Sequence, residues 1–87
     1  MYALAVKEGV DRKFTKLARK DPRRLEAVRK KVQEILADPH RFKPLRAPMH
    51  GLRRVHVGPF VLVYEIDEAN RTVILWDFEH HDRVYLR

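Results

Sequence analysis

The hydrophobic residues of this chain change their spacing once, between Leu36 and Leu52. Between Glu8 and Leu36 they recur every three or four positions, which is the spacing of one face of an α-helix. From Leu52 onward they alternate and are rich in Val, Ile, Phe and Tyr, which is typical of half-buried β-strands. Helical and strand patterns that are segregated along a chain predict an α+β domain.

These patterns predict the order strand, helix, helix, strand, strand, strand. Asp21 and Pro22 have the side chains of an N-cap and a first helical residue, so a second helix is expected to follow the first directly. We expect a helical hairpin packed on one face of a small, mainly antiparallel sheet, with a loop over Pro39–Gly51. The expected elements are a strand at Met1–Val6, helices at Glu8–Lys20 and from Pro22 to the Asp38-Pro39 pair, and strands at Leu52–Val57, Phe60–Asp67 and Thr72–His80.

Composition limits the kinds of chemistry that are available. The 87 residues form one expected domain, residues 1–87, without cysteine or serine, which excludes disulfides, cysteine-bound zinc and a serine nucleophile. No apolar run reaches the roughly 20 residues of a membrane span, and no signal-peptide pattern is present, so we expect a cytoplasmic protein with no membrane partner.

The formal net charge of +7 favours a polyanionic partner, nucleic acid or the ribosome, over a role in solubility alone. Basic residues of the first helix could contact phosphates or could simply be solvated. They are Arg12, Lys13, Lys16, Arg19 and Lys20.

Alternation along the strands predicts which side chains share a face of the sheet. The face beneath the helices is expected to carry Val55, Val57, Phe60, Leu62, Tyr64, Ile66, Ile74, Trp76 and Phe78. The opposite face is expected to be half apolar and half ionisable, with Arg54, His56, Val61, Val63, Glu65, Val73, Leu75, Asp77 and Glu79. Such a face predicts an interaction groove.

Arg54 and His56 share that second face with Glu79, and His81, Arg83 and Tyr85 follow within reach. Cleavage of RNA by its own 2′-OH needs a base, a cation to stabilise the phosphorane and an acid for the leaving 5′ oxygen. Histidine, arginine and tyrosine side chains could supply all three, although they could also be merely solvated. Because adjacent residues of a strand point to opposite faces, we expect His80 and His81 not to share a metal ion, and we expect no metal site or other cofactor.

The stretch Leu52 to Tyr64 and the closing His80-His81-Asp82-Arg83-Val84-Tyr85, in this order after a basic helical hairpin, resemble the RelE/ParE superfamily of toxin-antitoxin toxins. The resemblance covers nearly the whole chain and is nearest to the RelE branch. It implies a RelE-like fold and a ribosome-associated endoribonuclease, an mRNA interferase, which cleaves mRNA without a metal and inhibits translation. It also implies a cognate acidic antitoxin.

The resemblance implies that Arg54 and His56 match the pair of basic residues with which the family contacts and activates RNA. It also implies that Tyr85 matches the family's C-terminal tyrosine. Val61 and His81 stand where arginines are usual, and Arg53 and Arg83 could compensate for that charge, with His56 and His81 as an acid-base pair. The same departures leave two alternatives open: a ParE-like toxin that inhibits DNA gyrase without nuclease activity, and a non-catalytic basic RNA- or ribosome-binding domain. Candidate apolar anchors for the antitoxin are Val61, Val63, Leu75 and Leu86.

Overall fold

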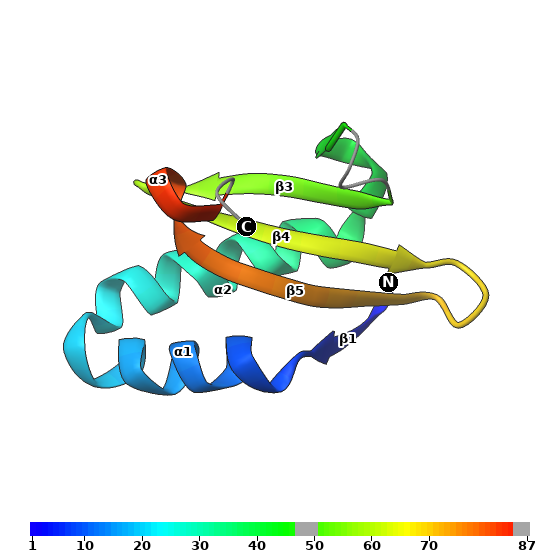
Figure 1. Cartoon of the computed structure of the whole chain (residues 1–87). Coiled ribbons are helices and arrows are strands. Elements are labelled where there is room, and N and C mark those ends of the chain that lie inside the picture. The colour runs from blue at the N-terminus through cyan, green and yellow to red at the C-terminus, as the bar shows by residue number, and fades with distance from the viewer. Residues whose placement is uncertain (47–50, 85–87) are drawn as a thin grey trace.

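A computed structural model describes residues 1–46 and 51–84 of the chain. The predicted helical hairpin and three-stranded meander are both present, and Figure 1 shows both helices on one side of the sheet. None of the helices in the described residues has the length and apolar character of a membrane span. The elements are β1 (Ala3–Val6), α1 (Glu8–Lys20), α2 (Pro22–Ala37), η1 (Pro39–Arg41), β2 (Lys43–Pro44), β3 (Leu52–Val57), β4 (Phe60–Asp67), β5 (Thr72–His80) and α3 (His81–Val84).

The sheet has the strand order β1-β5-β4-β3-β2. Strands β2 to β5 run antiparallel to their neighbours, and β1 pairs with β5 in parallel. Short turns between β3, β4 and β5 permit only antiparallel pairing, whereas β1 reaches the sheet from across the helical hairpin. The mainly antiparallel α+β fold is therefore confirmed.

Local capping explains where the second helix begins. The Asp21 carboxylate oxygen Oδ1 accepts a hydrogen bond from the backbone N–H of Arg24 at 3.1 Å, and Pro22 occupies the first helical position. Both features satisfy or remove donors that the first helical turn leaves without partners. The helix ends at Ala37, and Pro39 begins the one-turn η1 helix.

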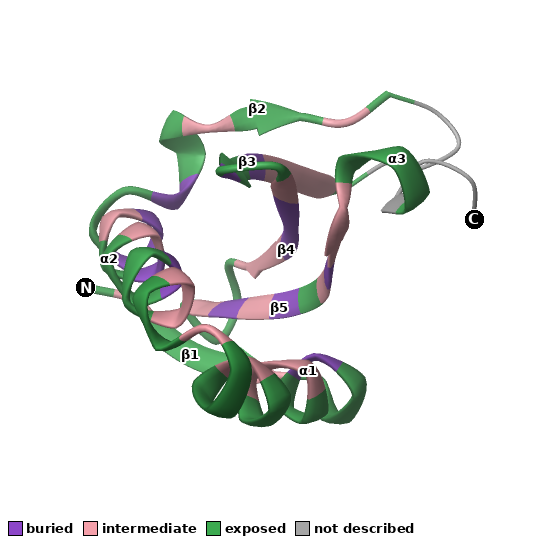
Figure 2. Ribbon diagram, turned by 90° about the vertical axis from the view of Figure 1, so that its left-hand side faces the viewer, coloured by how far each residue is buried: buried purple, intermediate pink, exposed green. Residues whose placement is uncertain are grey.

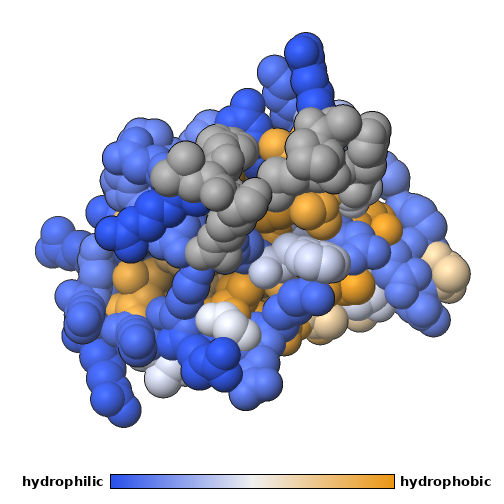
Figure 3. All heavy atoms as spheres, viewed as in Figure 1, coloured by the Kyte–Doolittle hydropathy of each residue, from blue (hydrophilic) through white to orange (hydrophobic). Residues whose placement is uncertain are grey.

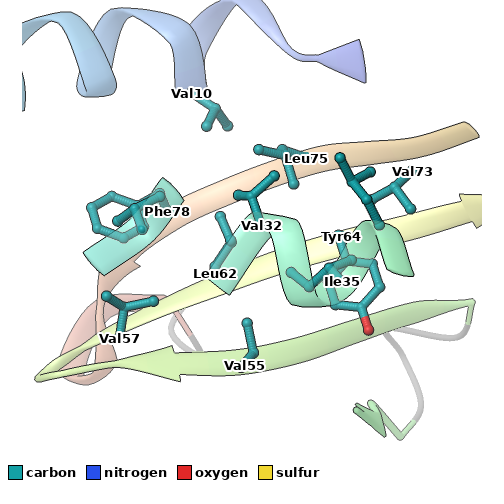
Figure 4. Packing of buried hydrophobic residues seen from close by; sticks show 12 residues of the cluster. Val10, Val32, Ile35, Val55, Val57, Leu62, Tyr64, Val73, Leu75 and Phe78 are labelled. Atoms are coloured by element: carbon teal, nitrogen blue, oxygen red, sulfur yellow. The ribbon is translucent and has the colours of Figure 1, made fainter. Parts of the chain in front are cut away.

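The main core lies between α2 and the sheet. Val28, Val32 and Ile35 of α2 belong to one buried cluster with Leu62 and Tyr64 of β4, and Figure 4 shows Val32 and Ile35 beside these two side chains. Figure 2 shows that the buried positions of α2 face the strands. The Tyr64 hydroxyl donates a hydrogen bond to the Pro39 carbonyl at 2.7 Å, so this buried phenol is satisfied by the turn that follows α2.

The expected alternation fails in the first half of β5. Leu62 of β4 pairs with Phe78, Val63 with Asp77, and Tyr64 with Leu75, so Trp76 is an extra residue in β5. Such a β-bulge reverses the faces of all residues on one side of it. Val73 and Leu75 therefore belong to the main core, and the expectation that Ile74 and Trp76 lie beneath the helices is wrong.

The expected loop after α2 contains two short elements. The η1 turn brings the Pro39 carbonyl to Tyr64, and Lys43 and Pro44 of β2 pair with Arg54 and Arg53 of β3. Proline is tolerated in β2 because this strand lies at the edge of the sheet.

Candidate functional site

Pairing between β3, β4 and β5 places ionisable residues in two neighbouring rows on the face away from the helices. One row contains Arg54, Val63 and Asp77, and the next contains His56, Val61 and Glu79. Directly paired residues of a sheet point to the same side, so each row crosses three strands on one face. The predicted common face of Arg54, His56 and Glu79 is therefore confirmed.

Lys13 of α1 reaches the β5 end of these rows. Its Nζ atom lies 3.1 Å from Asp77 Oδ1 and 3.0 Å from Glu79 Oε2. The two carboxylate side chains are only 18% and 16% exposed, so their mutual repulsion is poorly screened by water and a cation between them is stabilising. Lys13 thus offsets much of the negative charge that β5 brings to this face.

The short α3 helix folds the residues after β5 back over the β3–β4 turn. The backbone N–H of His81 donates to the Pro59 carbonyl at 3.0 Å, and the His81 Nδ1 atom lies 3.1 Å from the same oxygen. Arg83 Nη1 lies 3.9 Å from Glu79 Oε1. His56, two residues before the turn, thus lies at the same end of the sheet as His81 and Arg83. Tyr85 and Leu86 lie outside the described residues.

This face combines cations with two imidazoles. Arg54, Lys13 and Arg83 are positively charged. Asp77 and Glu79 are both in contact with Lys13, and Glu79 also lies near Arg83. Figure 3, which shows this side of the molecule, has apolar surface across its middle and hydrophilic residues around it. Guanidinium groups can stabilise a developing phosphorane charge, and imidazoles can accept or donate protons near neutral pH. The arrangement is chemically suited to phosphodiester binding and proton transfer.

Three of the predicted antitoxin anchors do not lie on open surface. Val61 and Val63 are 0% and 1% exposed and form a second small core with Leu45 and Leu52. Leu75 is 0% exposed in the main core, because the bulge turns it toward the helices. These three positions are corrected from partner contacts to packing residues.

Arg53 is also placed differently from the prediction. It pairs with Tyr64, on the opposite face from Arg54, and its Nη1 atom donates to the carbonyl oxygens of Phe42 at 2.7 Å and His40 at 3.3 Å. Its guanidinium therefore holds the segment between α2 and β2, and it does not share the face of Arg54 and His56.

The basic residues of α1 divide into two groups. Lys16, Arg19 and Lys20 are exposed, and Arg12 is exposed and paired with Glu8 at 2.8 Å. Lys13, expected like the others to contact phosphates or to be solvated, instead contacts Asp77 and Glu79 of the site. A signal was present, because position 13 is three residues after buried Val10 and so lies near the helix face that packs on the sheet.

The prediction that His80 and His81 point to opposite faces assumed that the strand continues past His80. β5 ends at His80 and α3 begins at His81, so the backbone turns between them. The two imidazole centroids are 4.5 Å apart, on the same side of the chain rather than on opposite faces.

A model of the ParE toxin of type II toxin-antitoxin systems (parDE) matches residues 5–85. An uncharacterized protein from Methanosarcina mazei is 50% identical over 98% of this chain and 100% of its own length. A Methanocaldococcus jannaschii protein, provisionally named toxin RelE4, is 43% identical over 98% of this chain and 92% of its own length.

The fold is also found in a solved structure, that of the toxin-antitoxin complex RelBE2 from Mycobacterium tuberculosis. Its similar chain is 29% identical, with a TM-score of 0.79, over 92% of this chain and 98% of that chain. The chain therefore has matches over nearly its whole length both to relatives and to one chain of a toxin-antitoxin complex.

Proposed function

The chain belongs to the RelE/ParE superfamily of type II toxin-antitoxin toxins, and from that premise we propose that it is an endoribonuclease that cleaves mRNA on the ribosome and inhibits translation. The proposal is supported by the arrangement of side chains on the face of β3, β4 and β5 that lies away from the helices. It places Arg54 and His56 in neighbouring rows, with His81 and Arg83 at the same end of the sheet.

In the proposed reaction, His56 or His81 takes the proton of the ribose 2′-OH, and the 2′ oxygen attacks the adjacent phosphorus. The bond from phosphorus to the 5′ oxygen then breaks, and the other imidazole or Tyr85 gives that oxygen a proton. Arg54 and Arg83 stabilise the charge of the phosphorane. The products are a 2′,3′-cyclic phosphate and a 5′-OH, so no metal or other cofactor is needed.

RNA binding outside the reacting phosphate is assigned to the exposed cations of α1. Arg12, Lys16, Arg19 and Lys20 lie on the helix that also supplies Lys13 to the site. A strand of RNA that enters the site past α1 would meet these side chains, and the net charge of +7 favours its approach.

An antitoxin is the second proposed partner, and the toxin-antitoxin assembly of the relative from M. tuberculosis supports it. Charge complementarity favours an acidic binding segment, because the chain has 19 Lys and Arg residues against 12 Asp and Glu residues. Leu86 stays a predicted anchor. We place both partners in the cytoplasm, where translation occurs.

A ParE-like inhibitor of DNA gyrase is the alternative function. The family model that matches residues 5–85 is that of the ParE toxin, and Val61 and His81 stand in place of arginines that cleavage would use. Val61 is fully buried, so no charged group could occupy its position without rearranging the second core.

Primer extension on a ribosome-bound message, with the purified chain, tests the proposal. We expect new 5′ ends at discrete positions, and at least about 100-fold slower cleavage for Arg54→Ala and His81→Ala, because each removes a group that acts on the reacting phosphate. Arg23→Ala, an exposed arginine of α2, is the matched control and should cleave at the wild-type rate.

A gyrase supercoiling assay on the same preparations separates the alternatives. An intact message together with inhibited supercoiling would replace the nuclease by the ParE-like function. An intact message with unaffected gyrase, from a chain shown to be folded by circular dichroism, would leave a non-catalytic binding domain.

A further inference from the structure

The junction between β5 and α3 gathers three metal-ligating side chains. His80 ends the strand, and His81 and Asp82 begin the helix, so both imidazoles and the carboxylate lie around one turn of backbone. One ligand atom from each residue lies within 4.8 Å of the other two. Within residues 1–46 and 51–84, these three side chains form the one group of three or more His, Cys, Asp or Glu residues that is compact enough to hold a metal ion.

The separations are near those of a coordination shell. His81 Nε2 lies 3.0 Å from Asp82 Oδ1, and His80 Nδ1 lies 3.4 Å from Asp82 Oδ2. Ligand atoms that bind zinc tetrahedrally at about 2.0–2.1 Å are about 3.3 Å from one another. Both printed separations are therefore close to tetrahedral spacing, and the two imidazole ligand atoms lie within 4.8 Å of each other.

The hydrogen bond of His81 gives a second and independent argument. Its Nδ1 atom lies 3.1 Å from the Pro59 carbonyl, which can only accept, so this nitrogen carries a proton. In a neutral imidazole, the Nε2 lone pair then faces the Asp82 carboxylate at 3.0 Å, and two acceptors would oppose each other. A cation between them, either a second proton or a metal ion, removes that repulsion. The same bond to Pro59 is the kind of outer-shell contact that orients histidine ligands in metal sites.

His80 is held in place by its neighbours. Its ring packs edge-on against Phe60 at a centroid distance of 5.7 Å, and its Nδ1 atom accepts a weak hydrogen bond from the Asp82 backbone N–H at 3.3 Å. Ligation through Nδ1 would replace this bond, and a flip of the ring would offer Nε2 instead. Aromatic packing thus limits the positions of the ring without occupying its nitrogen atoms.

We propose that His80, His81 and Asp82 bind one divalent transition-metal ion, with Zn²⁺ as its representative and water at the remaining position. Imidazole and carboxylate ligands favour zinc, copper and nickel, whereas magnesium and calcium prefer oxygen ligands throughout. Three protein ligands leave a coordination position open, as in zinc sites that exchange a ligand. This site is inferred from the junction alone. Because it uses the His81 Nε2 atom, bound Zn²⁺ would exclude His81 from proton transfer and leave that step to His56.

Isothermal titration of the full chain with ZnCl₂ tests the site, and Asp82→Asn and His80→Gln test its ligands. We expect one Zn²⁺ per wild-type chain and at least about 10-fold weaker binding in each variant, because each loses a ligand. His40→Gln is the matched control, since His40 is another exposed histidine paired with a carboxylate, 2.7 Å from Glu68 Oε1. It should bind zinc as the wild type does.

Histidine side-chain ¹⁵N NMR distinguishes the metal from the proton. Zinc should shift the ring nitrogens of His80 and His81 and leave those of His40 unchanged. Absence of saturable binding by the folded wild type, with imidazolium signals for His81, would show that a proton fills the position and would overturn the proposal. Wild-type affinity in Asp82→Asn would overturn it as well, and this exposed position makes loss of folding an unsuitable explanation.

Discussion

The hydroxyl of Tyr64 belongs to a fully buried side chain, and its hydrogen bond to the Pro39 carbonyl links the end of α2 to the centre of the sheet. We expect Tyr64→Phe to lower the free energy of unfolding by about 1–2 kcal/mol, because the Pro39 carbonyl loses its donor while the ring still fills the space. Urea unfolding at neutral pH measures this change.

Because the Tyr64 phenol is buried, we also expect the protein to lose stability at alkaline pH. Burial raises the pKa of Tyr64 from 10.0 to about 12. Since the folded pKa is the higher one, the phenol's contribution is complete below pH 10 and is lost as pH rises toward about 12. The wild type should therefore lose stability relative to Tyr64→Phe over this range. Parallel loss in both proteins would contradict the assignment.

The charge of Lys13 is expected to contribute to stability through Asp77 and Glu79. Lys13→Met should destabilise the chain by about 1–2 kcal/mol at pH 7, because Asp77 and Glu79 then repel each other at a partly buried position. Lys16→Met, on the exposed side of the same helix, is the matched control and should change stability by less than about 0.5 kcal/mol. The difference should vanish in an Asp77→Asn, Glu79→Gln background, because no carboxylates are left there for the lysine to neutralise. A difference that persists there would show that packing of the lysine stem causes the effect.

Among the elements, β5 shows how one inserted residue changes what a strand presents. Trp76 is 41% exposed, its Nε1 atom donates to Glu65 at 2.7 Å, and Lys7 Nζ lies 3.6 Å from its ring centroid. As the chain has one tryptophan, its fluorescence reports on this position alone. We expect efficient acrylamide quenching in the folded state and a small emission shift on unfolding. Protected, blue-shifted emission would mean that the strand keeps its alternation and that the bulge is absent.

Helix α2 offers a test of local capping. Asp21→Ala should lower stability by about 1 kcal/mol, because the Arg24 N–H loses its side-chain acceptor and keeps only the Asp21 carbonyl. Asp21→Asn keeps an acceptor oxygen in the side chain and should retain most of this stability. Asp38→Ala is the control, since the Asp38 side chain makes no capping bond at the start of η1. Thermal unfolding of the three variants distinguishes a cap from a general charge effect, which would make Asp21→Asn as unstable as Asp21→Ala.

For the whole molecule, the net charge of +7 predicts that RNA binding depends strongly on salt. If about four phosphates are contacted, the slope of log affinity against log salt is about −3, so a fourfold rise in salt weakens binding by about 50-fold. Substitution of Lys16, Arg19 and Lys20 by Gln should make the slope less steep by about two. An unchanged slope would show that this side of α1 is only solvated. Fluorescence anisotropy with a labelled RNA measures both slopes.

The sequence alone determined the helices, the meander and the face shared by Arg54 and His56. These features depend on local forces: hydrophobic period, the Asp21-Pro22 cap and short turns act within a few residues. The family resemblance likewise depended on motifs contiguous in the chain, and the match to the ParE toxin model over residues 5–85 confirmed it.

Contacts between side chains that are distant in the sequence depended on how the elements pack in three dimensions. Trp76 moved outward because a bulge aligns Leu75 with Tyr64, and Arg53 turned to the carbonyls beside η1. Lys13 joined Asp77 and Glu79 because α1 packs along β5, and His80 met His81 because the strand ends between them. Each of these outcomes depends on register, on packing between distant segments or on where an element stops. Hydrophobic period cannot specify such features, because alternatives that differ by a single residue leave nearly the same sequence pattern.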